Sequence, residues 1–292
     1  MFKPPIGIFS VEIPTRGAFQ WRVTLALVTL YLIGNLAGVP LSRKMDAPIE
    51  PVWFWGIVTL LSALVIALSL IMANRVGLGA PLLEGSLTKA DRPLWIRSGL
   101  ALILLCCVIA SPVSLAVNLN VDRMTYPFGW ELLGASFKAG VVEELGYRFF
   151  MLALFVWVGS FLKHDLEGRP HPTVFWVSIL LTALLFGWAH VAARLGHPTA
   201  AWDDYACIMA LNSGIGFYFG WIFWKLGLEW AIMAHFAYDA FVSMILIPVY
   251  IVRSPLVWAI LIAALITSVV ISWRMLSFVQ WHKDHSPNPA RT

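Results

Sequence analysis

Three short clusters of ionisable residues interrupt apolar stretches of this 292-residue chain. An ionisable side chain at the centre of a bilayer costs at least about 2.5–3.5 kcal/mol on insertion scales, so such residues mark a functional site by default. Carboxylates beside imidazoles are the groups that general acid–base catalysis uses. In chain order the clusters are Glu143-Glu144-x-x-x-Arg148, Phe186-x-x-x-His190 and His235-x-x-x-Asp239.

The spacing within the first cluster predicts two different roles for its glutamates. Glu144 and Arg148 are four residues apart with the acid first, which is the favourable order for a helical ion pair. Adjacent residues differ by about 100° around a helix, so we expect that Glu143 and Glu144 cannot both address one partner. Glu143 then lacks a local cation, and an unpaired carboxylate in low-dielectric surroundings binds a proton readily enough to act as a general base. The alternative is a structural ion network of all three residues.

The two histidines extend this pattern to other helices. His235 and Asp239 share one helical face, so the carboxylate could fix the imidazole tautomer, or the pair could jointly donate to a substrate oxygen. Each histidine alone could instead be an interhelical hydrogen-bond partner. Glu143, His190, His235 and Asp239 come from three different helices, however, and together they indicate an assembled site. A glutamate that activates water, with polarising groups opposite, fits peptide-bond hydrolysis.

These motifs, in this order, resemble the CPBP (CAAX protease and bacteriocin-processing, or Abi) family of intramembrane proteases, which includes the type II CAAX prenyl endopeptidases. The resemblance covers about residues 140–244. It implies an eight-helix fold, and it implies cleavage of substrates at or within the membrane. The chain departs from the usual pattern at Phe149, where the family often has Gly, and in the 47-residue step between Glu143 and His190. Neither departure touches the chemistry, but both leave the substrate open.

The resemblance also implies a role for each residue that matches a motif. Glu143 would activate water, assisted by His190. His235 and Asp239 would stabilise the oxyanion. The remaining members of the first motif, Glu144 and Arg148, would be supporting residues.

A metal centre is the alternative to a metal-free glutamate mechanism. Two histidines with carboxylates can bind zinc. The HExxH motif is absent, however, and neither the His-x-x-x-Asp spacing nor the paired glutamates is a specific zinc signature. Cys106, Cys107 and Cys207 show no CxxC spacing, which predicts neither a zinc ribbon nor a disulfide framework. We therefore expect no cofactor, and zinc is possible but not favoured.

Composition decides the class of protein in which these residues lie. Hydrophobic residues make up 60% of the chain and charged residues 12%, with a mean hydropathy of +0.79. Soluble domains have roughly 45–50% apolar and about 25% charged residues, so a soluble enzyme is excluded. The apolar runs are continuous, whereas a β-barrel needs dyad alternation. We predict an all-α, polytopic membrane bundle whose partners are the lipid bilayer and a membrane-associated peptide or protein. The net charge of +4 gives no reason to expect nucleic acid.

Eight apolar stretches are long enough to cross a bilayer, which takes about 20 residues. They form a single predicted membrane domain over residues 1–292, with a catalytic core over 128–252 that carries the three motifs. The stretches are 21–41, 52–73, 94–117, 128–152, 174–192, 205–224, 228–252 and 256–279.

The distribution of Lys and Arg predicts the orientation. With eight spans both termini share one side, and that side carries 13 of the 20 basic residues, whereas the opposite side carries 5. By the positive-inside rule both termini are therefore cytoplasmic. The absence of a recognisable organelle signal favours a bacterial inner membrane, and the endoplasmic reticulum is the alternative.

Two other functions compete with proteolysis. A membrane immunity protein or scaffold of the same fold would keep the motifs without hydrolysis, and the sequence does not separate it from a protease. A transporter could use the same charges as a proton relay. Transporters usually have repeated halves, and the charges here lie in one half of the chain, which disfavours that function. The favoured function is an intramembrane endopeptidase acting on a membrane-associated or prenylated substrate.

Overall fold

The computed structural model describes residues 20–44, 51–121, 129–165, 168–195, 202–248 and 254–285, and these residues are helical apart from short connections. The expected all-α fold is therefore confirmed. The helices are α1 (Trp21–Lys44), α2 (Val52–Arg75), α3 (Arg92–Val121), α4 (Glu131–Glu143), η1 (Glu144–Leu152), α5 (Ala153–Ser160), α6 (Pro172–Arg194), α7 (Trp202–Leu226), α8 (Leu228–Phe241), η2 (Val242–Leu246) and α10 (Pro255–His285).

Each predicted span coincides with a helix or with a continuous helical run. The run α4–η1–α5 corresponds to the fourth span and α8–η2 to the seventh, whose predicted end at 249–252 lies outside the described residues. Within the described residues, five helices are long and apolar enough to cross a membrane, namely α1, α2, α6, α7 and α10. The runs through α4 and α8 carry the charged clusters, which lowers their apolarity. The chain is a multi-pass membrane protein.

The outer surface of the bundle is apolar, as lipid contact requires. Large hydrophobic side chains are exposed on the outward faces of several helices, including Leu36 of α1, Leu60 of α2 and Ile266 of α10. Polar and charged groups that are fully buried lie instead between helices, Glu144 and Arg148 among them. The bundle therefore has an apolar outer surface, and its buried ionisable groups lie between the helices.

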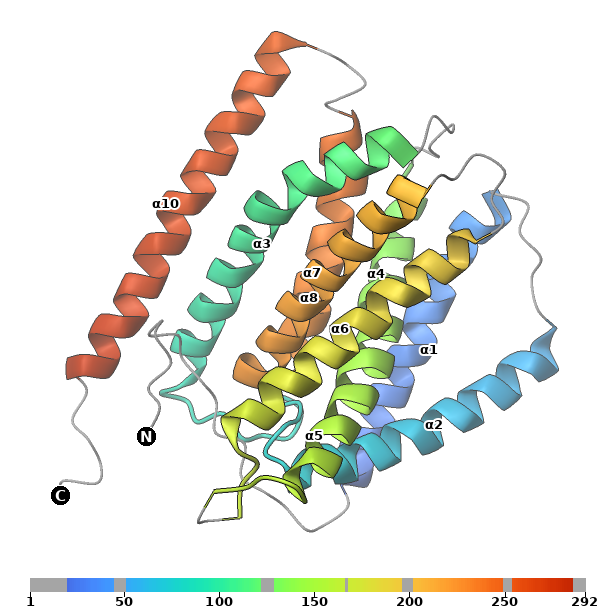
Figure 1. Ribbon diagram of the computed structural model, residues 1–292, viewed down its shortest axis with the longest axis vertical. Coiled ribbons are helices and arrows are strands. Elements are labelled where there is room, and N and C mark those ends of the chain that lie inside the picture. The colour runs from blue at the N-terminus through green and yellow to red at the C-terminus, as the bar shows by residue number, and fades with distance from the viewer. Residues whose placement is uncertain are drawn as a thin grey trace.

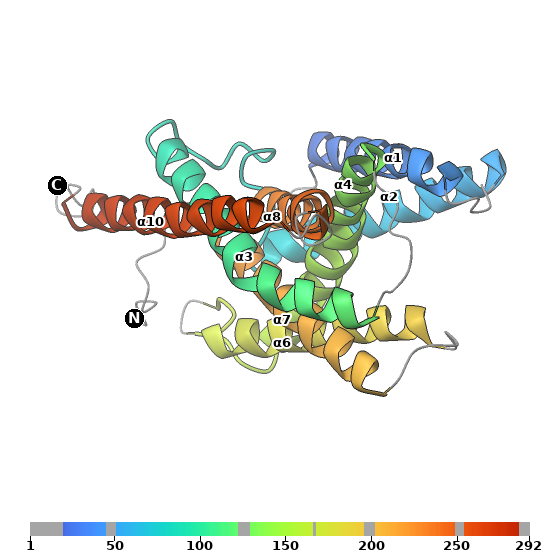
Figure 2. The same cartoon turned by 90° about the horizontal axis from the view of Figure 1, so that it is seen from above.

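The run α4–η1–α5 passes through the middle of the bundle (Figure 1). It packs against α1 and α2 on one side and against α8 and α6 on the other. Helix α6 packs along α7, which in turn contacts α3 and α8. Seen from above, α10 lies at one end of the molecule beside α3, and α1 with α2 lies at the opposite end (Figure 2).

Glycines allow two close helix crossings next to the charged clusters. A Cβ on Gly140 would lie 3.0 Å from the carbonyl oxygen of Ile232 and 3.0 Å from the amide nitrogen of Phe236, so α4 and α8 meet backbone to backbone there. A Cβ on Gly187 would lie 2.8 Å from the carbonyl oxygen of Met209, which sets the crossing of α6 and α7. Small residues at such positions are what tight helix association in membranes uses.

The start of α8 is fixed by the connection between α2 and α3. Glu229 accepts hydrogen bonds at one carboxylate oxygen from the amides of Leu82 and Leu83, at 2.9 and 3.1 Å. Gly227 has a φ of 97°, a conformation that side chains rarely adopt, and a Cβ there would collide with Pro81. A segment nearly 150 residues earlier in the chain therefore anchors the helix that carries the third cluster.

Candidate active site

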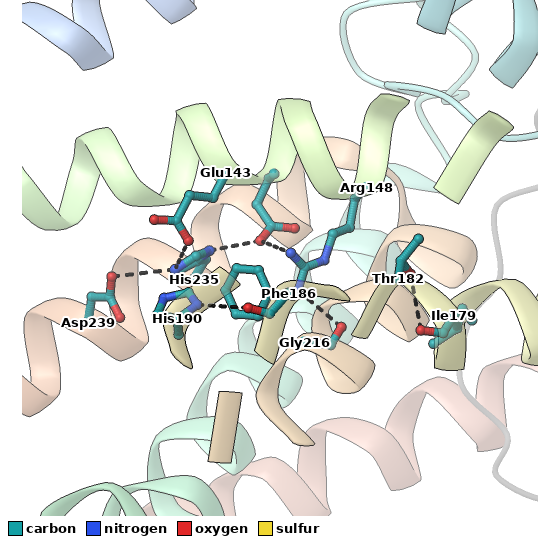
Figure 3. Close-up of polar contacts among 10 residues, drawn as sticks. Glu143, Arg148, Ile179, Thr182, Phe186, His190, Gly216, His235 and Asp239 are labelled. Carbon is teal, nitrogen blue, oxygen red and sulfur yellow. Dashed lines mark hydrogen bonds and ion pairs between the residues drawn. The ribbon is translucent and has the colours of Figure 1, made fainter. Parts of the chain in front are cut away.

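The three ionisable clusters meet around the ring of His235 (Figure 3). The glutamates come from the junction of α4 and η1, His190 comes from near the end of α6, and His235 with Asp239 comes from the second half of α8. The structure thus brings all six residues singled out in the sequence into one cluster. Different helices supply them, so the site exists only in the folded bundle.

A buried frame lies on one side of the His235 ring. Nδ1 of His235 lies 2.8 Å from Oε1 of Glu144, and the same oxygen lies 3.2 Å from the Nη1 atom of Arg148. Nη2 of Arg148 donates to the carbonyl oxygen of Gly216 on α7 at 3.1 Å. The side chains of Glu144 and Arg148 are 0% and 1% exposed. The ion pair expected from the spacing of four residues therefore forms, and its carboxylate also accepts a hydrogen bond from Nδ1 of His235.

An open pair of carboxylates lies on the other side of the ring. Nε2 of His235 is 3.8 Å from Oε2 of Glu143 and 3.4 Å from Oδ2 of Asp239, and each of these two side chains is 32% exposed. Two carboxylates facing one ring nitrogen need a proton between them, either on the nitrogen or on a carboxyl oxygen. A proton on Nε2 would lie between these two carboxylates.

The expectation that Glu143 and Glu144 cannot address one partner is wrong. Both reach His235, because an imidazole presents two nitrogens in different directions and each glutamate takes one of them. The backbone helps: η1 is a π-helix that begins at Glu144, and its wider turns reduce the divergence of successive side chains. Glu143 consequently has a partner in His235, rather than standing alone.

His190 lies beside His235 with a defined tautomer (Figure 3). Its Nδ1 is 2.9 Å from the carbonyl oxygen of Phe186, one turn earlier in α6. A carbonyl oxygen can only accept, so Nδ1 carries a proton, and when the ring is neutral Nε2 has a free lone pair. His190 is thus able to accept a hydrogen bond from a water molecule at the site.

Aromatic side chains fix both histidines and the guanidinium. Phe219 stacks on His235 at 4.8 Å between centroids with an interplanar angle of 21°. Phe186 contacts the ring of His190 at 4.6 Å, and its face lies 4.5 Å from the guanidinium carbon of Arg148. These contacts replace water around the buried charges and restrict rotation of the rings.

Sequence reasoning missed the contributions of α7. Phe219 and Gly216 give no signal, because a phenylalanine and a glycine are ordinary residues in an apolar helix. A Cβ on Gly216 would lie 3.0 Å from a ring carbon of Phe186 and 3.2 Å from Nη2 of Arg148, so only glycine leaves its carbonyl open to the guanidinium. Gly216 and Gly220 both face α6, where a Cβ would meet Phe186 and Ile179 respectively.

Among the described residues, no group of three or more His, Cys, Asp or Glu side chains has the geometry to hold a metal ion. Cys106, Cys107 and Cys207 form no disulfide with one another. Within the cluster, Oε2 of Glu143, Oε2 of Glu144 and Nη1 of Arg148 are buried without a hydrogen-bond partner, although Nη1 lies within ion-pair distance of Oε1 of Glu144.

Comparison with known proteins agrees with the motifs. Residues 126–241 match the family model described as Type II CAAX prenyl endopeptidase Rce1-like. This range includes all six residues of the cluster. No curated protein and no solved structure matches the chain. The family resemblance drawn from the motifs is therefore confirmed: residues 126–241 of this multi-pass membrane protein are similar to the Rce1-like type II CAAX prenyl endopeptidases, a family of proteases.

Proposed function

We propose that the chain is an intramembrane endopeptidase that hydrolyses a peptide bond of a membrane-associated or prenylated substrate with water activated by Glu143. One observation carries this proposal: Glu143 and Asp239 are each one-third exposed, whereas Glu144 and Arg148 behind them are buried. A rigid buried frame that presents partly open acid–base groups is what a catalytic site needs. The protease family of the domain supports the class of reaction.

The proposed first step is attack of water on the substrate carbonyl. Ionised Glu143 takes one proton of the water, and Nε2 of His190 accepts a hydrogen bond from the other, which orients the attacking oxygen. The new carbon–oxygen bond forms as the carbonyl π electrons move to oxygen. His235, protonated at Nε2 beside Asp239, donates to this oxyanion. Such donors act most strongly where water is excluded.

The second proposed step breaks the peptide bond. The oxyanion re-forms the carbonyl, the carbon–nitrogen bond breaks, and Glu143 gives its proton to the leaving amine. The products are a carboxylic acid and an amine, so one water is consumed and no redox partner is needed. Glu144 and Arg148 do not touch substrate in this scheme; they hold Nδ1 of His235 and thereby aim Nε2.

The test of the role of Glu143 is the variant Glu143→Gln. Acid–base groups contribute typically 10²–10⁴-fold, so we expect cleavage to fall by roughly 10³-fold while the protein remains folded. Peptide termini are compared by mass spectrometry in membranes from cells that express either form at equal levels. New termini seen only with the parent chain identify both proteolysis and the substrate.

A matched control is Glu131→Gln at the start of α4, which removes a carboxylate from the same helix but outside the cluster. It is expected to give the parent pattern of termini. Identical patterns for the parent and Glu143→Gln, with the phenotype of a deletion still rescued by the variant, would replace the protease by an immunity or scaffold role.

We further propose that the reaction needs no metal. The support is that both nitrogens of His235 already have carboxylate partners, Glu144 at Nδ1 and Glu143 with Asp239 at Nε2. Dialysis of the purified chain against a strong zinc chelator is expected to leave the cleavage rate within about twofold, because acid–base catalysis by the side chains is unaffected. A loss of activity that added Zn²⁺ restores would contradict the metal-free mechanism.

A further inference from the structure

A groove distinct from the catalytic cluster runs between α5 and the first half of α6, at the lower end of the bundle in Figure 1. It encloses about 460 Å³, within the size range of ligand sites. Its floor is the contact of Gly159 with Val174, where a Cβ on the glycine would lie 2.6 Å from Cγ1 of the valine. Its walls are apolar and include Leu154, Phe155 and Val158 of α5 and Val177 and Leu181 of α6.

The groove ends at a cation. Lys163, just beyond α5, lines it together with Thr173 in the first turn of α6. The carbonyl oxygen of Lys163 accepts from the amide of His171 at 3.2 Å, which fixes the backbone at this end. Within the part of the chain that the structure describes, no carboxylate forms an ion pair with the exposed Lys163 amine.

We propose that this groove binds an anionic phospholipid of the surrounding bilayer, with one acyl chain between α5 and α6 and the phosphate at Lys163. The walls face outward, Val158 and Val177 being about half exposed, so they are in contact with lipid chains in a membrane. An ammonium at the membrane boundary attracts anionic head groups, and Lys binds phosphate as a point charge. The charge and the apolar walls are thus complementary to the two parts of one molecule.

The position of the groove argues against the lipid chain of a substrate as the occupant. Val177 lies 13 residues before His190 on the same helix, which is about 20 Å at 1.5 Å per residue. Under the proposed function, the scissile bond lies at the cluster around His235, toward the other end of α6. Binding of a bilayer lipid in the groove itself needs no proteolysis, so it can be tested apart from the proposed function.

The experiment measures lipids retained by the purified full chain. The protein is reconstituted in discs of phosphatidylcholine with a minor fraction of phosphatidylglycerol of the same acyl composition, extracted, and analysed by native mass spectrometry. We expect the parent chain to retain phosphatidylglycerol about fivefold over its share, which corresponds to one Lys near the surface. Lys163→Glu is expected to abolish this enrichment, and Val177→Trp, which fills the groove from an exposed position, to reduce retention of both lipids.

Two matched variants control for general effects of charge and bulk. Lys89→Glu changes an exposed lysine on the connection before α3, and Ile266→Trp enlarges an exposed residue of α10; both are expected to behave as the parent chain. Equal enrichment in Lys163→Glu and Lys89→Glu would overturn the proposal. Displacement of phosphatidylglycerol by a prenylated peptide, bound independently of Lys163, would overturn it in favour of the substrate chain.

Discussion

His235 gives the cluster its direction, because its two nitrogens have separate partners. Nδ1 is fixed by buried Glu144, and the ring is stacked on Phe219, so Nε2 always faces the open side between Glu143 and Asp239. The groups that aim this nitrogen are therefore different from the groups that would meet substrate. Changes to the two sets have different consequences.

At this scale we predict that the paired glutamates differ in their effect on stability. Glu144→Gln leaves the guanidinium of Arg148 buried without its carboxylate, and loss of one partner of a buried pair costs about 3–5 kcal/mol. Glu143→Gln changes a side chain that is 32% exposed and should cost little. Thermal unfolding in detergent measures both: the midpoint of Glu144→Gln is expected to fall well below that of the parent chain. Equal midpoints for the two variants would contradict the division into frame and open pair.

Sequence spacing predicted part of this arrangement and missed another part. The pairs Glu144–Arg148 and His235–Asp239 follow from an interval of four residues on one helix. The sharing of His235 by both glutamates does not follow from the rotation of about 100° between adjacent helical residues, because that argument holds only for a partner with a single polar atom. An aromatic ring with two polar atoms removes that restriction.

At the scale of the element, the crossing of α6 and α7 determines whether Arg148 reaches its backbone acceptor. Gly216→Ala would place a methyl group 3.0 Å from Phe186 and 3.2 Å from Nη2 of Arg148. Displacement of this frame is expected to lower activity by about 10–100-fold, since small misplacements of catalytic groups have effects of this size. Cleavage rates of the folded variant, checked by its elution as a single species, test this.

The same helix supplies a matched control for that prediction. Gly214 lies two residues earlier, and nothing lies within 4 Å of a Cβ built there. Gly214→Ala is expected to leave activity unchanged and to stabilise the helix slightly, by about 0.5–1 kcal/mol, through reduced freedom of the unfolded chain. A comparable loss of activity in both variants would mean that α7 tolerates no alanine in this region, and the role assigned to Gly216 would fail.

The helices themselves were predictable, whereas the contacts between them were not. Long apolar stretches indicate spans without reference to any partner, which is why the described helices fall where they were expected. The π-helical turn at Glu144 depends on tertiary packing, and so do the hydrogen bonds from the amides of Leu82 and Leu83 to the carboxylate of Glu229. Nothing local in residues 78–86 specifies a partner nearly 150 residues away.

At the scale of the whole molecule, the orientation in the membrane remains a prediction. The excess of Lys and Arg on the side of the termini predicts that both are cytoplasmic. A fluorescent protein that folds only in the cytoplasm, fused after Thr292, is expected to fluoresce in bacterial cells. A fusion truncated after Arg194, on the predicted opposite side, is expected to stay dark but to be active with alkaline phosphatase. The reverse pattern would invert the topology.

The separation of the cluster along the chain also has a consequence for the timing of synthesis. The contact between Glu144 and His235 joins residues 91 positions apart, and Glu229, which anchors α8, enters the membrane only shortly before His235. Glu143 and Glu144 lie in the fourth predicted span and His235 lies in the seventh. During synthesis, both glutamates are therefore inserted before the imidazole that they contact. A chain whose synthesis has not yet reached α8 therefore lacks the proposed site, and its proteolytic activity is expected to begin only after α8 has been inserted.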